Sequence, residues 1–124
     1  MLLRNSKAFS GFAVNDLDKA RAFYGETLGL NTSAQEGLLT LHLAGDRDTL
    51  IYFKPDFAPA TYTILNFPVD DIVRAVDELT ANGVTFERYE GIGQDDRGIH
   101  KTDGPLIAWF TDPAGNVLSV LQQP

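Results

Sequence analysis

The stretch Gly11-Phe12-Ala13-Val14-Asn15-Asp16-Leu17 has a similar second copy later in the chain, Asn66-Phe67-Pro68-Val69-Asp70-Asp71-Ile72. The offset between the copies, from Val14 to Val69, is 55 residues. Each copy is an apolar run that can alternate between two faces, followed by a polar pair and then by a helical pattern. This order predicts a strand, a helix cap and a helix in each half of the chain.

The helix expected after each copy has clear limits. Apolar residues recur at helical spacing over 17–28 and 72–79, so each helix has one face to lay on a sheet. The polar pair of each copy can accept hydrogen bonds from the free N–H groups of the first turn. Gly29 and Gly83 follow the last periodic residues, where a left-handed helix end favours glycine.

Strand-like segments follow each helix, although one strand of the first half is not evident from the pattern. The expected strands are 38–44, 49–54, 84–88, 106–111 and 116–121. A half of this length cannot bury its own sheet, so two copies should pack as one unit. We therefore predict an α+β fold, a single domain over 1–124. Two pseudo-symmetric βαβββ modules, about 7–54 and about 61–122, would form curved mixed sheets around a cleft.

The composition excludes several classes of partner. The chain has 124 residues, no cysteine and a formal net charge of −7. An acidic surface repels nucleic acid and anionic membranes, and favours a cationic or neutral ligand. No apolar stretch is as long as a membrane span, and the start lacks the pattern of a signal peptide. We therefore expect a cytoplasmic protein with no nucleic-acid and no membrane partner.

The chain resembles the vicinal oxygen chelate superfamily, the fold of glyoxalases, bleomycin-resistance proteins and extradiol dioxygenases. The matching segments are Val14-Asn15-Asp16-Leu17, Phe23-Tyr24, Leu28-Gly29-Leu30, Val69-Asp70-Asp71-Ile72, Gly83-Val84 and Phe110-Thr111-Asp112-Pro113-Ala114-Gly115-Asn116. The resemblance runs from about Lys7 to Gln122. It implies the paired modules described above, and it implies a homodimer, since many relatives are homodimers.

The same resemblance locates the positions that hold a metal ion in metal-dependent relatives. They fall on Phe9, on Ile64, near Ile51 and on Ser119. These side chains lack the nitrogen and carboxylate donors that a divalent ion requires. The resemblance therefore points to the metal-free, bleomycin-resistance-like branch, whose members bind small molecules. We expect a small-molecule ligand, no metal and no cofactor.

Two alternatives remain open. The chain could be a lyase, isomerase or dioxygenase of glyoxalase type with a displaced metal site. His42, His100 and Glu87 or Glu90 would then be the donors. It could also be an accessory protein whose cleft is filled by its own side chains. Whether it is an enzyme is left open by the sequence.

If the positions that the resemblance locates face the cleft, alternation along the strands predicts which other side chains do so. A turn centred on Ala114 places Trp109 opposite Ser119, and a two-residue turn at Asp46-Arg47 would place His42 opposite Ile51. The predicted lining consists of Phe9, His42, Ile51, Phe53, Tyr62, Ile64, Asn66, Trp109 and Ser119. Such a lining suits a planar or partly apolar molecule. The alternative interpretation is that the aromatic residues are ordinary core.

The polar, glycine-rich segment 89–104 is a candidate lid. As a lid it would bring His100, and Arg97 or Asp96, over the ligand. The alternative is a solvated connection with an exposed histidine. The run from Gly91 to Asp96 imitates a dinucleotide-binding motif, but it lacks the third glycine and a following helix, so we reject that motif.

Overall fold

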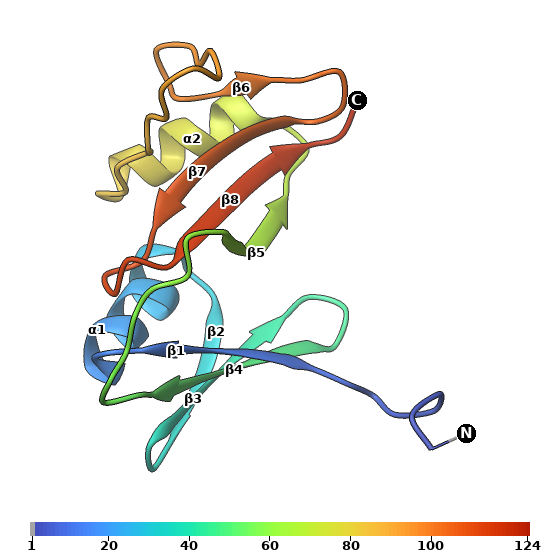
Figure 1. Ribbon diagram of the computed structural model, residues 1–124, viewed down its shortest axis with the longest axis vertical. Helices are drawn as coiled ribbons and strands as arrows, with labels where there is room; N and C mark the ends of the chain where they lie inside the picture. Colours follow the sequence, from blue (N-terminus) through green and yellow to red (C-terminus); the bar gives the residue numbers. More distant parts are fainter. Residues whose placement is uncertain (1) are drawn as a thin grey trace. The chain divides into compact units, whose positions relative to one another are not determined.

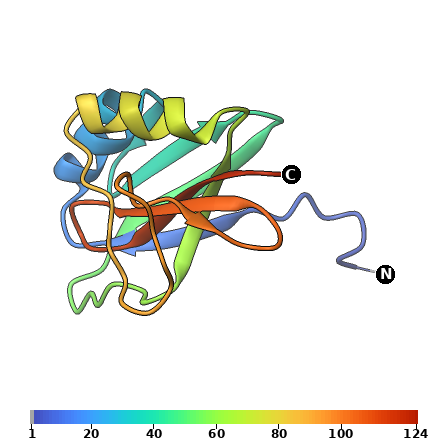
Figure 2. The same cartoon turned by 90° about the horizontal axis from the view of Figure 1, so that it is seen from above.

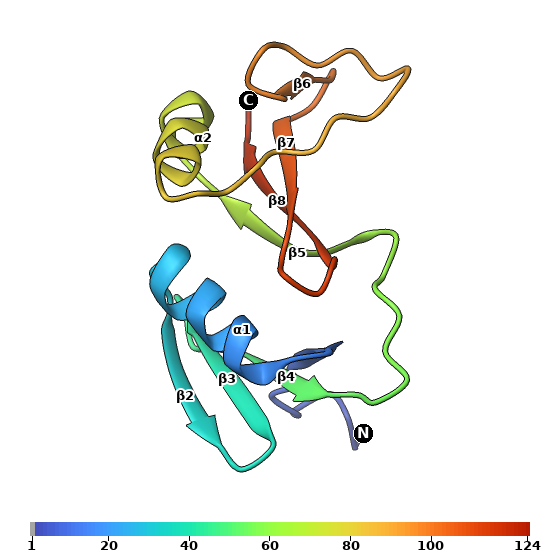
Figure 3. The same ribbon diagram turned by 90° about the vertical axis from the view of Figure 1, so that its left-hand side faces the viewer.

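A computed structural model describes residues 2–124 (Figure 1). The chain divides into two compact units, Met1–Phe57 (unit 1) and Ala58–Pro124 (unit 2). Each unit contains a four-stranded mixed sheet with a helix on one face (Figure 3). This is the α+β fold of two βαβββ modules that the repeat predicts. Within residues 2–124, no helix is both long enough and apolar enough to cross a membrane.

Unit 1 follows the predicted order of elements. These are β1 (Ser10–Val14), α1 (Leu17–Arg21), a π-helical continuation η1 (Ala22–Thr27), β2 (Asn31–Gln35), β3 (Leu38–Leu43) and β4 (Arg47–Phe53). The sheet order is β1-β4-β3-β2, with β1 parallel to β4 and the other pairs antiparallel.

The helix of unit 1 starts at a side-chain cap and covers one face of its sheet. Asp16 Oδ1 accepts a hydrogen bond from Lys19 N at 3.0 Å. The buried Tyr24 meets Phe12 of β1 with ring centroids 5.8 Å apart. The helix-facing side of the sheet is the core of this unit. Its buried residues include Val14, Leu39, Leu41 and Ile51.

Unit 2 repeats the arrangement. Its elements are β5 (Thr63–Pro68), α2 (Ile72–Ala81), β6 (His100–Lys101), β7 (Leu106–Thr111) and β8 (Val117–Gln122), with sheet order β5-β8-β7-β6. Asp71 Oδ1 caps α2 by accepting from Arg74 N at 3.1 Å. Ile72 and Val76 of α2 are buried, as are Phe110 of β7 and Leu118 of β8. They form the core of this unit.

The expected strand 84–88 is the part of unit 2 that differs most from the prediction. It is reduced to an isolated bridge between Phe86 and Phe110. Beyond this bridge the chain follows the long irregular connection between α2 and β6 (Figure 2). In Figure 3, α2 lies on one side of β7 and β8, and much of the connection lies on the other side.

The β3–β4 hairpin has a different register from the predicted one. Three residues, Ala44 to Asp46, form the turn, so His42 pairs with Asp48 and Leu39 pairs with Ile51. The cause is local, because Gly45 and Asp46 both adopt positive φ, 80° and 56°. A one-residue change in the turn moves every side chain of β4 to the opposite face.

The ligand-facing placement that the resemblance gives to Ile51, and that alternation then gives to Phe53, is wrong. Ile51 pairs with Phe12 and is fully buried on the helix-facing side. Phe53 pairs with Val14 and lies on that same side. His42 lies on the opposite face of the sheet, the far face of unit 1, which is turned away from α1.

Candidate functional site

One row of side chains crosses the far face of unit 2, the sheet face turned away from α2. Trp109 of β7 pairs with Ser119 of β8, as the predicted turn at Ala114 requires, and Ser119 pairs with Asn66 of β5. Ladder partners share a face, so the three side chains lie side by side. Their role in binding a ligand stays a prediction.

Ser119, in the middle of this row, is hydrogen-bonded to its neighbour Asn66. Ser119 is fully buried, and its Oγ donates to Asn66 Oδ1 at 2.6 Å. The buried hydroxyl therefore has its partner within the protein. This position, which the family resemblance assigns to a metal-binding carboxylate, carries a neutral and satisfied group.

The donor chemistry of the chain does not fit a divalent ion. Phe9 and Ile64 offer no donor atom, and the Ser119 hydroxyl is already engaged. In the described chain, 2–124, no group of three or more His, Cys, Asp or Glu side chains is placed to hold a metal ion. We therefore assign no chemical step to a metal.

Three aromatic rings lie together at the Trp109 end of the row, and we call them the aromatic cluster: Tyr89, His100 and Trp109. The Tyr89 and Trp109 rings meet edge to face, with centroids 5.5 Å apart and planes at 71°. The His100 and Trp109 rings are 6.1 Å apart and tilted by 31°. His100 pairs with Ile107, two residues from Trp109, which places it on the far face. Tyr89 is exposed and the other two rings are half-buried, so the cluster leaves aromatic surface for a further planar group.

A carboxylate lies beside the cluster. Glu87 N–H donates to the Trp109 carbonyl at 2.7 Å, and Thr111 Oγ1 is 3.4 Å from Glu87 Oε1. Partial burial of Tyr89, with the negative charge of Glu87, raises the pKa of its phenol above the usual value of 10.0. The phenol therefore stays neutral at physiological pH, and Glu87 is the negative charge of the site.

Neither Tyr89 nor Thr111 is among the ligand-facing residues that the sequence predicts, and Glu87 is a candidate there only as a metal donor. The sequence pattern places Glu87 in a strand and Tyr89 at the start of the candidate lid. What brings Glu87 to the site is the bridge between Phe86 and Phe110, which no periodic pattern in the sequence marks. It places the next residue, Glu87, beside Trp109.

The segment predicted as a lid is fastened along its length. The Gln94 side chain accepts from Tyr89 N at 2.7 Å and donates to the carbonyls of Glu87 and Gly98 at 2.9 and 2.7 Å. His100 Nδ1 is 3.0 Å from the Gly93 carbonyl. These bonds join the segment to itself and to Glu87 beside the aromatic cluster, and its role as a lid, one of the two alternatives above, stays a prediction.

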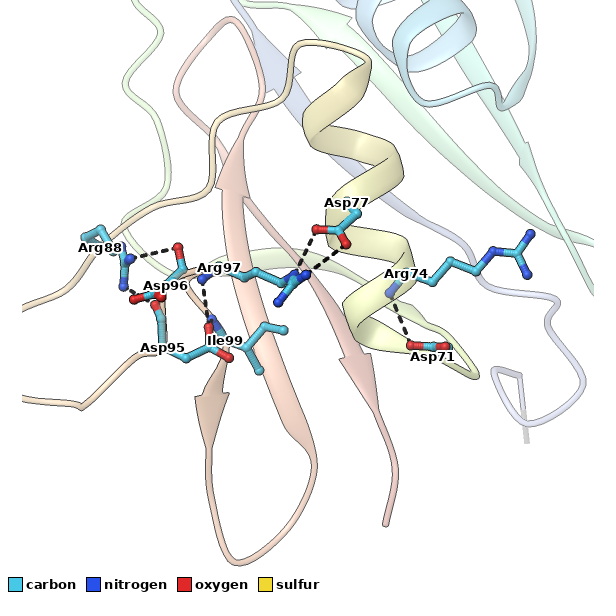
Figure 4. Close-up of polar contacts among 8 residues, drawn as sticks. All are labelled: Asp71, Arg74, Asp77, Arg88, Asp95, Asp96, Arg97 and Ile99. Carbon is cyan, nitrogen blue, oxygen red and sulfur yellow. Dashed lines mark hydrogen bonds and ion pairs between the residues drawn. The ribbon is translucent and has the colours of Figure 1, made fainter.

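Arg97 does not contact the aromatic cluster. Its Nε and Nη2 donate to the two carboxylate oxygens of Asp77 on α2, at 2.8 and 3.1 Å (Figure 4). Arg88 donates to the carbonyls of Asp95 and Asp96 and closes the same loop. The Arg97 guanidinium therefore joins the loop to the helix, and its contact with a ligand stays a prediction.

This ion pair predicts a pH dependence of stability. The hydrogen bond from Arg97 lowers the pKa of Asp77 below its usual 3.8. A lowered folded-state pKa gives stability that is complete above 3.8 and is lost as the pH falls through the lower folded-state value. In urea unfolding, the midpoint of Asp77→Asn should lie slightly below that of the wild type at neutral pH. The two midpoints should converge in acid, and a constant difference would contradict this assignment.

Tyr62 and Ile64, the remaining predicted lining residues of unit 2, do not belong to the row of Trp109, Ser119 and Asn66. Tyr62 is 71% exposed just before β5, and Ile64 is half-buried at a bulge between Thr63 and Leu65. The bulge breaks the alternation on which their placement was based. Phe9, 68% exposed, and His42 belong to unit 1.

Comparison with known proteins gives the same fold. A family model described as Glyoxalase/Bleomycin resistance protein/Dioxygenase superfamily matches residues 9–120. The comparison with curated proteins found no match.

Three solved structures illustrate the similarity. TnmS3, an antibiotic binding protein from Streptomyces sp. CB03234, is 26% identical, with 97% of this chain and 98% of that chain covered and a TM-score of 0.72. A member of the same superfamily from Sphaerobacter thermophilus is 24% identical, with 98% and 100% covered and a TM-score of 0.74. The fosfomycin resistance protein FosX from Mesorhizobium loti is 13% identical, with 98% and 95% covered and a TM-score of 0.68.

Proposed function

Since the chain belongs to the glyoxalase, bleomycin resistance protein and dioxygenase superfamily, we propose that it binds a small organic molecule without a metal or other cofactor. The ligand is planar, at least partly apolar, and neutral or cationic. It lies against the aromatic cluster of unit 2. The protein holds this molecule and carries out no chemistry on it at this site.

The observation that carries the proposal is the edge-to-face contact of Tyr89 and Trp109 beside Glu87. An edge-to-face pair leaves part of the tryptophan face free for stacking. A positive group on the stacked ligand is attracted both by the aromatic face and by the carboxylate. The overall charge of −7 adds a weak long-range preference in the same direction.

The similarity to TnmS3 supports a binding role. That protein is an antibiotic binding protein, and it is similar to this chain over nearly the whole length of both. Antibiotics are among the small organic molecules that the proposal covers. The identity of the ligand does not follow from this similarity, because fold does not fix function.

The single tryptophan of the chain provides the test. Three probes of similar ring size and different charge are titrated: an aminoacridine cation, neutral anthraquinone and anthraquinone sulfonate. The cation, and more weakly the neutral probe, should quench Trp109 fluorescence and raise the melting temperature. The sulfonate should do neither, because Glu87 repels it.

Two outcomes would overturn the proposal. One is the absence of quenching and of a thermal shift with both the cation and the neutral probe. The other is stronger binding of the sulfonate than of the cation, which would show that Glu87 does not set the charge preference. A free tryptophan analogue titrated in parallel corrects for quenching by collision.

A further inference from the structure

A second cluster of chemically competent side chains lies on the far face of unit 1. Ser33 is on β2, His42 on β3 and Asp48 on β4, and His42 pairs directly with Asp48 across the ladder. Ser33 pairs with Thr40, two residues from His42, and so shares the face. Three neighbouring strands therefore present a hydroxyl, an imidazole and a carboxylate side by side.

Hydrogen-bond distances link the three groups in a chain from Ser33 through His42 to Asp48. Ser33 Oγ is 2.7 Å from His42 Nε2, and His42 Nδ1 is 3.1 Å from Asp48 Oδ1. A carboxylate can only accept hydrogen bonds, so the proton of the neutral imidazole belongs on Nδ1. The lone pair of Nε2 then accepts the hydrogen bond from the Ser33 hydroxyl. This tautomer is the one that a general base requires.

We propose that Ser33 is a nucleophile, activated by His42 and oriented by Asp48, which accepts acyl groups from activated esters. The arrangement meets the geometric test for such a relay: a nucleophile within hydrogen-bond reach of a base that a third group orients. The proposal is independent of ligand binding at the aromatic cluster, which belongs to unit 2.

The reaction needs only the ester, the three side chains of the relay and water. Ser33 Oγ forms a bond to the ester carbonyl carbon while its proton moves to His42 Nε2, and Asp48 stabilises the resulting imidazolium. The bond from the carbonyl carbon to the leaving oxygen then breaks, and the alcohol or phenol departs with that proton. Water next attacks acyl-Ser33 with His42 as base, which releases the carboxylic acid and restores the serine.

The surroundings set the expected rate and substrate class. The side chains of His42 and Asp48 are 44% and 53% exposed, so water screens the relay. Asn31, which pairs with His42, shares the face and is the neighbouring amide able to donate to a developing oxyanion. A wet site of this kind suits esters with good leaving groups, and turnover should be slow.

The test uses p-nitrophenyl acetate and the full chain. The wild type should release a burst of one equivalent of p-nitrophenolate, and peptide mass spectrometry should locate the acetyl group on Ser33. Ser33→Ala should remove the burst. His42→Gln should slow acylation about 100-fold, the lower end of the usual contribution of a positioned base. Asp48→Asn should also slow it, by a smaller factor.

Ser10→Ala is the matched control, because Ser10 is an exposed serine of the same sheet outside the relay. It should react as the wild type does. Circular dichroism checks that each variant is folded. Acetylation confined to lysines, or an unchanged acylation rate in His42→Gln, would overturn the proposal.

Discussion

Replacing Phe110 with alanine is expected to lower the free energy of unfolding by about 3–5 kcal/mol. Phe110 is 1% exposed, and its ring meets Phe86 with centroids 5.5 Å apart. Removing it deletes apolar contacts and leaves a cavity between α2 and the sheet. Because small domains are stable by only about 5–15 kcal/mol, much of the total would be lost. Urea unfolding followed by circular dichroism measures the change.

Phe110→Leu is the control for this prediction. Leucine keeps most of the apolar volume and leaves a smaller cavity, so the loss should be clearly smaller than for alanine. A change below about 1 kcal/mol in Phe110→Ala would show that this side of β7 is not the core of unit 2.

The fold could be predicted from the sequence because its signals are local and occur twice. Each copy of the repeat carries its own cap, and in both copies the second residue of the polar pair, Asp16 or Asp71, accepts the hydrogen bond. The strand that the pattern did not reveal is β2, an edge strand whose residues, apart from the half-buried Thr32, are exposed. It has no buried side to mark with apolar residues, so periodicity could not identify it.

The register of the β3–β4 hairpin could not be predicted, because it depends on the backbone of two turn residues. Gly45 and Asp46 both take positive φ, and only Gly45 is of a type that commonly does so. A two-residue turn is the commoner choice for a hairpin, and it leads to the opposite face for β4. The predicted pairing of His42 with Ile51 fails because of this one turn, whereas the faces predicted for Ile51 and Phe53 came from the family resemblance.

The candidate site was predictable only where regular strands form it. The resemblance gives Ser119, the short turn places Trp109 opposite it, and alternation from Ile64 gives Asn66. Tyr89 and Glu87 depend on an irregular loop whose path is set by Gln94 and Arg88. Those hydrogen bonds have no periodicity, so they leave no pattern in the sequence.

Replacing Trp109 with alanine is expected to weaken binding of the aminoacridine cation about 10- to 100-fold. Stacking on an aromatic side chain contributes about 1–3 kcal/mol, and each 1.4 kcal/mol is about a tenfold change in affinity. Trp109→Phe keeps an aromatic face and should lose only part of this. Because the variants lack the only tryptophan, isothermal calorimetry replaces fluorescence as the measurement.

Loss of binding in Trp109→Ala can be distinguished from loss of the fold. Trp109 and Phe110 are neighbours on β7 with opposite faces, so Trp109→Ala should affect binding far more than unfolding. Val73→Ala on α2 removes an exposed apolar side chain from the other side of the sheet and should leave affinity unchanged. If Trp109→Ala binds the cation as tightly as the wild type does, the ligand does not stack on the aromatic cluster. The site must then be sought elsewhere in the chain.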